Sequence, residues 1–323
     1  MSLSVTVGIP TRNNEDTIRE TLTQLVEGTR PPDRIVIVDA SDDRTTQIIG
    51  ELAAESEVPI DVYGQSKQGR GVGRARQDIY EQFEGDLLAC LDTNVQVDDT
   101  WLERHVAFHE ANPEYDVLSA APLRDVDGPV TDPKRGFYFQ QANCTVTREA
   151  IDRIRGWDPW LPRGEDWDAS IRLWRSGARA YARNDLSGET IDDTEDQTAV
   201  DKALQRPSSV AFLRKYGLWY ARFHPVHPLG DSLSLVSILG LVATPLVAVV
   251  APTVSLTMLI GVVLVVLCFL YFDLVAHYDR WWIHPRDFRD VPRFFVFGYT
   301  ALREFVAGDR PWNYGGLDEE TSD

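Results

Sequence analysis

The apolar run Leu87–Leu91 stops abruptly at Asp92, and this boundary constrains the fold more than any other feature of the sequence. A short apolar run that follows Gly85 and Asp86 is typical of a strand buried in a parallel sheet. Ligands of open α/β sheets bind just beyond the carboxyl ends of such strands. Asp92 therefore stands where a functional residue is expected; the alternative is a solvated turn that merely ends the strand.

Two further polar residues follow Asp92 at alternate positions. Asn94 and Gln96 are separated by Val95, so in extended backbone all three polar side chains would point to one side. They offer oxygen ligands of the kind that Mg²⁺ and Mn²⁺ prefer, and the same oxygens suit sugar hydroxyls. The pattern predicts a metal or sugar site directly after the strand.

Strand and helix patterns alternate through the first part of the chain. We predict strands at 4–9, 34–38, 60–63 and 87–91, and helices at 15–26, 45–54 and 71–83. This alternation predicts an α/β fold with a doubly wound, mostly parallel sheet and flanking helices. A dinucleotide-binding fold would carry a G-x-G-x-x-G turn after its first strand, and residues 8–13 lack it. A cofactor-dependent dehydrogenase is therefore disfavoured.

Charge and cysteine usage limit the protein classes. The formal net charge is -18, from 50 acidic against 32 basic residues, whereas a nucleic-acid-binding protein would show a basic surface. An acidic chain with little lysine indicates a halophilic organism, with an ordinary acidic protein as the alternative. The cysteines Cys90, Cys144 and Cys268 show no disulfide or zinc spacing, which predicts a reducing compartment.

A glycine-rich stretch, residues 69–73, follows the third predicted strand. It carries Arg70, and Arg74 and Arg76 come shortly after it, near the start of a predicted helix. Arginines at such a place could bind a diphosphate, because backbone N–H groups and guanidinium groups both favour phosphate oxygens. A flexible loop that simply enters the helix is the alternative.

Three ordered segments resemble glycosyltransferases of family 2, which have the GT-A fold. Residues 5–22 contain Pro-Thr-Arg-Asn-Asn-Glu-Asp-Thr-Ile-Arg, and residues 35–45 read Ile-Val-Ile-Val-Asp-Ala-Ser-Asp-Asp-Arg-Thr. Residues 91–96 resemble the D-x-D element of the family, which reads D-x-D-x-Q in the branch of dolichol-phosphate sugar synthases. The resemblance predicts a GT-A domain over residues 1–222.

The resemblance also implies roles for particular residues. Asp39 would hold the base of a nucleotide diphospho-sugar, and Asp92, Asn94 and Gln96 would hold Mg²⁺ or Mn²⁺. The full set implied to bind the nucleotide sugar is Pro10, Thr11, Asn14, Asp39, Arg70, Arg76, Asp92 and Asn143.

The sequence departs from the family pattern at several of these places. Arg12 and Asn14 stand where a Tyr and a Glu are usual, and Asn94 replaces the second Asp of the metal element. Asparagine supplies an oxygen but no charge, so we expect weaker metal binding that the diphosphate completes. A metal-independent enzyme that relies on Arg70 or Arg76 is left open.

A second group of residues resembles the acceptor side of the family. Residues 142–150 resemble its acceptor-side strand, with Asn143 in the sugar pocket, and residues 164–168 resemble its G-E-D-x-D element. By that resemblance Asp166 is the general base and Glu165 orients it. Carboxylates at a helix start also serve as caps that interact with the helix dipole, which is the structural alternative. If the acceptor is a lipid phosphate, Asp166 only positions it.

Two further patterns bear on the reaction and on metal binding. The Q-x-x-R-W element of processive synthases is absent after Gly177, which predicts transfer of one sugar per encounter. His105 and His109 have the i, i+4 spacing of a helical metal pair, but we predict that they lie on a helix surface.

The C-terminal third predicts membrane attachment. Residues 233–250 and 254–270 are apolar and uncharged, and each is long enough to cross a hydrocarbon core. We predict a linker and two transmembrane helices over 223–278, an interfacial amphipathic helix over 279–312 and an acidic tail over 313–323. Arginines flank both ends of the hairpin, so the catalytic domain should be cytoplasmic. A buried hairpin of a soluble protein is the alternative.

Membrane segments point to a lipid-linked acceptor, because nucleotide sugars are themselves soluble. The predicted function is an inverting glycosyltransferase that moves one sugar to a polyprenyl- or dolichyl-phosphate-linked acceptor. The resemblance to archaeal transferases of this kind implies a role in assembling N-glycans of cell-surface glycoproteins. Two alternatives are a nucleotidyltransferase, which would carry a glycine- and lysine-rich first loop, and a non-catalytic membrane subunit with a degraded metal site.

Overall fold

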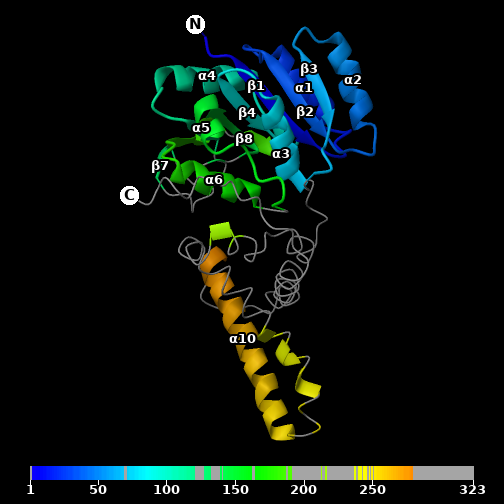
Figure 1. Cartoon of the computed structure of the whole chain (residues 1–323), viewed down its shortest axis with the longest axis vertical. Helices are drawn as coiled ribbons and strands as arrows, with labels where there is room; N and C mark the ends of the chain where they lie inside the picture. The colour runs from blue at the N-terminus through cyan, green and yellow to red at the C-terminus, as the bar shows by residue number, and fades with distance from the viewer. Residues whose placement is uncertain are drawn as a thin grey trace. The chain divides into compact units, whose positions relative to one another are not determined.

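The computed structural model describes residues 2–68, 71–120, 127–131, 139, 141–161, 164–186, 188–190 and 251–278, with scattered positions between 212 and 249. The chain divides into two compact units, Met1–Asp193 with Trp312–Asp323 and Thr194–Pro311. The first unit contains the sheet and the second contains the long helix α10 (Figure 1).

The first unit is built on an eight-stranded sheet of order β3-β2-β1-β4-β8-β6-β9-β7. The strands β1 to β4 pair in parallel, β8 runs antiparallel to its neighbours β4 and β6, and β9 runs parallel to β6 but antiparallel to β7. The bounds are β1 Val5–Thr11, β2 Arg34–Asp39, β3 Ile60–Gly64, β4 Leu87–Leu91, β6 Val117–Ala120, β7 Gly128–Val130, β8 Asn143–Thr147 and β9 Ala180–Arg183. A small second sheet pairs β5 (Val95–Gln96) with β10 (Glu189–Thr190).

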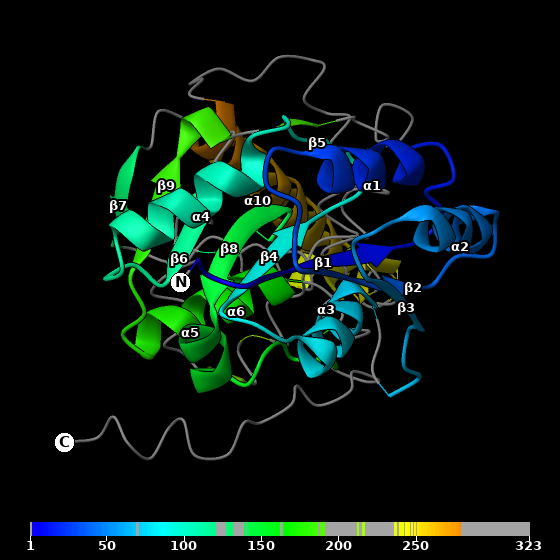
Figure 2. The same ribbon diagram turned by 90° about the horizontal axis from the view of Figure 1, so that it is seen from above.

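Helices cover both faces of the sheet, as Figure 2 shows. On one face lie α1 (Ile18–Glu27), α2 (Thr45–Glu55) and α4 (Trp101–Ala111). On the other lie α3 (Gly71–Gln82), α5 (Arg148–Arg153) and α6 (Glu165–Arg175). The predicted α/β fold with a mostly parallel sheet is confirmed.

Alternating side chains of the central strands explain the two cores. In β4, Leu87, Ala89 and Leu91 pack under α1 and α4, while Leu88 and Cys90 pack under α3 and α6. A strand covered on both faces must be apolar throughout, which is why β4 reads as an uninterrupted apolar run. Gly8 of β1 lets α3 approach closely, because a Cβ there would lie 2.5 Å from Ile79 Cγ2.

The prediction that His105 and His109 lie on a helix surface is wrong. Their exposed fractions are 0% and 3%, and both face β8 from α4. His105 Nδ1 lies 3.0 Å and His109 Nε2 lies 2.9 Å from the same hydroxyl, Oγ1 of Thr145. One hydroxyl donates only one proton, so at least one ring nitrogen donates to it. Burial lowers the pKa of His105 to about 3 and that of His109 to about 4, so both rings are neutral near pH 7.

Acidification should therefore destabilise the first unit. The folded-state pKa values lie below the unfolded value of about 6.5, so the unfolded chain binds more protons as the pH falls from 6.5 toward 4. We expect the free energy of unfolding to fall by up to about 1.4 kcal/mol per pH unit for each histidine over this range. Denaturant titrations between pH 7 and 5 measure this slope. A variant with both histidines changed to glutamine should show a flatter slope, and an unchanged slope would contradict the assignment.

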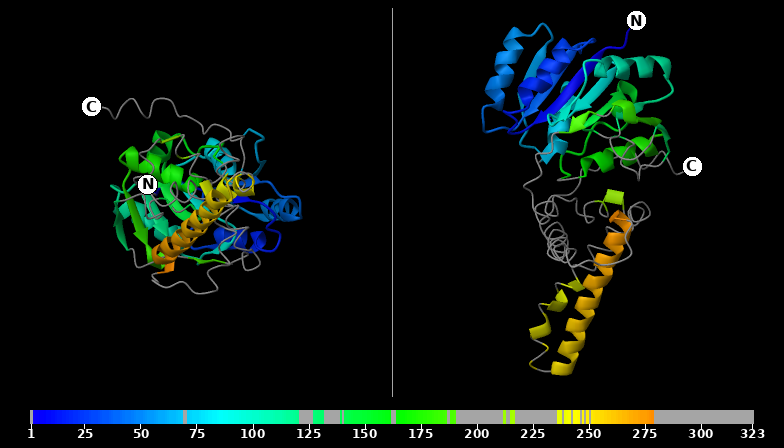
Figure 3. Two further views of the ribbon diagram at one scale, coloured as in Figure 1. Left: turned by 90° about the horizontal axis from the view of Figure 1, so that it is seen from below. Right: turned by 180° about the vertical axis from the view of Figure 1, so that it is seen from behind.

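The second unit is described around α10, which spans Pro252–Tyr278, with side chains described from Thr253 to Val266. The described residues before it run alongside the helix in Figures 1 and 3, since Ser255 Oγ donates to the carbonyl of Thr244 at 3.0 Å. A Cβ on Gly240 would lie 3.0 Å from Val262 Cγ2. Two apolar segments thus pack together in this unit.

Within the part of the chain that the structure describes, none of the helices combines the length and apolar character that crossing a bilayer requires. Most of the first predicted span, the predicted interfacial helix at 279–312 and the tail at 313–323 lie outside the described residues.

Candidate active site

The carboxyl ends of β2, β1 and β4 lie side by side at one edge of the sheet. Thr11, the last residue of β1, is in register with Asp39, the last residue of β2. Asp92 directly follows β4, and its backbone N–H donates to the carbonyl of Ala142 beside it at 3.0 Å. The sequence therefore places Asp39, Thr11 and Asp92 at the edge where ligands of such sheets bind.

Hydrogen bonds tie together the loops that follow β1 and β2. Asn13 has a φ of 56°, its N–H donates to Ser41 Oγ at 2.8 Å, and its Oδ1 accepts from the N–H of Asp42 at 2.9 Å. Asn14 accepts from Thr11 Oγ1 at 3.0 Å through its side chain. Of the residues predicted to contact the nucleotide, Pro10 and Thr11 thus end β1, and Asn14 lies in the loop that follows it.

Two hydrogen bonds fix the orientation of the Asp39 carboxylate. It is 8% exposed, Oδ1 accepts from the N–H of Ser41 at 2.9 Å, and Oδ2 accepts from the hydroxyl of Thr46. A carboxylate oxygen has more than one lone pair, so both oxygens can still accept from a ligand. The predicted base-binding residue is therefore oriented before any ligand arrives.

Arg76 joins the parts of the site that are distant in sequence. Its side chain is 6% exposed; Nη2 donates to Asp92 Oδ1 at 3.0 Å, and Nη1 donates to Glu165 Oε1 at 2.6 Å and to Gln141 Oε1 at 2.7 Å. Close approach of α3 to α6 makes this contact feasible, since a Cβ on Gly73 would lie 3.2 Å from Glu165 Cβ. The structure places the Arg76 guanidinium among protein oxygens, and its predicted contact with a diphosphate stays a prediction.

The cluster of Asp92, Glu165, Asp166 and Arg76 has perturbed proton affinities. Burial raises the pKa of Glu165 and of Asp166 above the usual carboxyl range, and Arg76 partly opposes both shifts. Burial alone would lower the pKa of Arg76, but Asp92 and Glu165 outweigh it and raise that pKa. Asp166 is half-buried, and its Oδ1 accepts from the N–H of Trp167 at 2.8 Å. A carboxylate with a raised pKa is a stronger base, which suits the role predicted for Asp166.

Two amides beside the cluster differ from expectation. Asn143 was predicted to line the sugar pocket, but its Oδ1 accepts from Trp101 Nε1 at 2.8 Å and its Nδ2 donates to the carbonyl of Leu186 at 3.1 Å. Both ends of that amide are hydrogen-bonded within the protein, and its place in the sugar pocket stays a prediction. Gln141, two residues earlier, reaches the cluster instead, and no sequence pattern singled it out.

The predicted metal ligands follow β4 along the chain, and the last of them, Gln96, lies in β5. Asn94 lies two residues after Asp92, and Gln96 pairs with Glu189 of β10. In the described ranges, no group of three or more His, Cys, Asp or Glu side chains could hold a metal ion. The donor set is thus one carboxylate and two amides, oxygens that fit Mg²⁺ or Mn²⁺ but bind them weakly. Arg70 lies outside the described residues.

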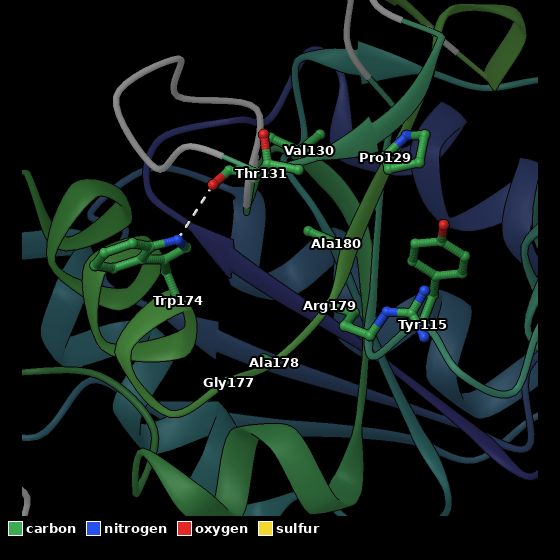
Figure 4. Close-up of a pocket in the computed structure, with 9 residues that line it drawn as sticks. All are labelled: Tyr115, Pro129, Val130, Thr131, Trp174, Gly177, Ala178, Arg179 and Ala180. Carbon is green, nitrogen blue, oxygen red and sulfur yellow. Dashed lines mark hydrogen bonds between the residues drawn. The ribbon is translucent and has the colours of Figure 1, made fainter. Parts of the chain in front are cut away.

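A pocket elsewhere in the unit contains none of the predicted residues. It has a volume of about 340 Å³, and its walls include Tyr115, Trp174 and Arg179 (Figure 4). The register of β4, β8, β6 and β9 places it at the sheet edge opposite Asp92. It is not part of the candidate active site.

The region that carries the site is similar in sequence to known proteins. Residues 6–161 match the family described as "Glycosyl transferase family 2". A "Pre-mycofactocin glycosyltransferase", from two strains of Mycobacterium tuberculosis, is 28% identical over 195 residues, covering 54% of this chain and 40% of that protein. The chain therefore spans less than half the length of these curated relatives.

Solved structures share the fold at low sequence identity. A mannosyltransferase from Pyrobaculum calidifontis, solved with GDP-Man and Mn²⁺, has a TM-score of 0.55 at 14% identity and covers 96% of this chain and 89% of its own. Residues 1–349 of S. aureus TarS give 0.53 at 17% identity, covering 97% of each chain. These solved structures show the fold alone, and the match to the family model covers the strands that lead to Asp39 and Asp92.

Proposed function

We propose that this protein is an inverting glycosyltransferase that moves one sugar from a nucleotide diphospho-sugar to a polyprenyl- or dolichyl-phosphate-linked acceptor. The observation that carries the proposal is the Arg76 guanidinium, which fixes Asp92 and Glu165 beside Asp166 at the sheet edge where Asp39 also lies. A donor base held at Asp39 and a base catalyst at Asp166 then flank the transferred sugar.

In the proposed reaction, Asp166 removes the proton of the acceptor hydroxyl while that oxygen attacks the anomeric carbon. The new glycosidic bond forms as the bond from the anomeric carbon to the diphosphate breaks, and the nucleoside diphosphate leaves. Attack from the side opposite the leaving group inverts the configuration. Positioned proton removal contributes roughly 10²–10⁴-fold to such reactions. Glu165 does not contact the reacting atoms in this scheme; it fixes Arg76.

A divalent cation fits the charge of the site. Three carboxylates, those of Asp92, Glu165 and Asp166, act on one guanidinium, and the donor diphosphate would add further negative charge. Asp92, Asn94 and Gln96 would hold Mg²⁺ or Mn²⁺, which supplies positive charge to the departing diphosphate.

Changing Asn94 to aspartate should strengthen metal binding. The substitution restores a second carboxylate beside Asp92, and charge on the ligands sets the affinity for hard cations. We expect the Kd for Mn²⁺, measured by calorimetry without nucleotide, to fall at least about tenfold. Asn112→Asp, remote from the site at the end of α4, is the matched control and should change nothing. Equal affinities in Asn94→Asp and the unaltered protein would remove Asn94 from the metal site.

The second unit supports the proposed membrane attachment and the proposed lipid-linked acceptor. Its side chains Leu256, Ile260, Val263 and Leu264 on α10 are each at least 50% exposed, a degree unusual for apolar residues facing water. A bilayer would cover them and would bring a lipid-linked acceptor to the enzyme. We propose attachment through residues 223–278 with the first unit on the cytoplasmic side, and a role in cell-surface N-glycan assembly in a halophilic archaeon.

Transfer of radiolabelled sugar from nucleotide sugars to membrane lipid tests this function. Membranes containing the full chain should form labelled material that extracts into organic solvent, and a soluble sugar acceptor should remain unlabelled. Label found only in the soluble acceptor would contradict the lipid-linked acceptor, while the proposal that the protein is a glycosyltransferase would stand.

A second candidate, a non-catalytic subunit that holds a lipid-linked glycan, is favoured by the neutral Asn94 in the metal element. Such a subunit should show no metal-dependent binding of UDP or GDP in calorimetry.

A further inference from the structure

Gln141 is a buried side chain at the centre of the candidate active site. It is 2% exposed and lies just before β8, and its Oε1 accepts from Arg76 Nη1 at 2.7 Å. A guanidinium only donates hydrogen bonds, so the oxygen of the amide must face it. This contact fixes which way the amide points and directs its nitrogen away from Arg76.

The Nε2 of Gln141 has no hydrogen-bond partner in the structure although it is buried. A buried N–H without a partner has lost its hydration with nothing in exchange, so it calls for an explanation, and a ligand that accepts from it supplies one. Asn143, two residues later, gives an internal comparison, since both ends of its amide are bonded within the protein. The unused donor therefore belongs to the amide that touches the catalytic cluster, and not to its neighbour.

The groups around this donor define what it can bind. Gln141 shares the Arg76 guanidinium with Asp92 and Glu165, so its amide group lies among the carboxylates of this cluster. An anionic ligand group would be repelled by these carboxylates. A hydroxyl fits, because it accepts from an amide N–H and donates to a carboxylate at the same time.

Resting on the proposed function, we propose that Gln141 is a donor-specificity residue whose Nε2 donates to a hydroxyl of the transferred sugar. The residue then binds the sugar part of the donor and not its nucleotide. A site that hydrogen-bonds a substrate hydroxyl discriminates strongly against donors that lack it, because the buried polar group is left unpaired.

Calorimetry on the full chain with Mn²⁺ tests this assignment, using GDP-mannose and UDP-N-acetylglucosamine as probes beside GDP and UDP. Two variants are compared: Gln141→Met, which removes both polar atoms, and Gln141→Glu, which keeps an oxygen for Arg76 but removes the donor. The readout is the ratio of the affinity for the nucleotide sugar to that for its bare nucleotide. This ratio cancels any change in charge or in the Arg76 contact that affects both ligands.

We expect the ratio to fall at least about tenfold in both variants for the sugar that the protein uses, with melting temperatures close to that of the unaltered protein for Gln141→Glu. An unchanged ratio in both variants, with the unaltered protein binding a nucleotide sugar, would overturn the role of Gln141 and leave the proposed function standing. Failure of the unaltered protein to bind any probe would overturn the proposed function and this inference with it.

Discussion

Replacing Arg76 with methionine is expected to lower the free energy of unfolding by about 3–5 kcal/mol, because the change leaves buried carboxylates without their partner. Glu165 is 9% exposed in its side chain and pairs with Arg76 at 2.6 Å. The Asp92 side chain is 31% exposed, so water partly solvates its carboxylate when Arg76 is removed. We therefore expect a loss nearer about 3 than about 5 kcal/mol. Denaturant unfolding near pH 7 measures the change.

Two matched variants make this prediction specific. Arg19→Met removes an exposed ion pair to Glu51 and should change stability little. Adding Glu165→Gln to Arg76→Met should recover part of the lost stability, because the uncompensated charge is then removed. The account of the cluster is contradicted if Arg76→Met behaves like Arg19→Met or if the second change recovers nothing.

Asp166→Asn should reduce the rate of sugar transfer by roughly 10²–10⁴-fold, the contribution of a positioned general base. Its stability should change little, since an amide oxygen can still accept from the N–H of Trp167. Donor binding should also persist, because Arg76, Asp92 and Glu165 are untouched. Because burial raises the pKa of Asp166, the rate of the unaltered enzyme should fall with acid at a pH above the usual carboxyl range.

Asp168, two residues along the same helix, provides the contrast. It is fully buried and pairs with Arg172, with Arg172 Nε donating to Asp168 Oδ2 at 2.8 Å. Asp168→Asn should therefore lower the melting temperature, whereas Asp166→Asn should lower the rate. Full activity in Asp166→Asn would exclude that residue as the base.

The sheet could be predicted because buried parallel strands have a strong local signature. Leu87–Leu91 is apolar at every position since both of its faces are covered, and the observed β4 has the predicted bounds. Asp39 and Asp92 were found for the same reason, as the first polar residues where such runs end. Topology then brings those ends together without further information from the sequence.

The side-chain hydrogen bonds between segments far apart in the chain could not be predicted. The i, i+4 spacing of His105 and His109 is the same on an exposed and on a buried helix face, and only Thr145, far along the chain, decides between them. Arg76 was recognised as a cation but not as the partner of Asp92 and Glu165, which lie 16 and 89 residues away. Gln141 gave no signal, because a lone glutamine before a strand matches no motif.

A crystal structure of the full chain with its nucleotide sugar and Mn²⁺ shows whether the donor binds across the strand ends from Asp39 to Asp166, which is the claim on which the proposed function depends. We expect the base at Asp39, the diphosphate at the end of β4 near Asp92, and the anomeric carbon facing Asp166. A nucleotide sugar bound at any other face, with Asp39 and Asp166 both free of it, would contradict the claim.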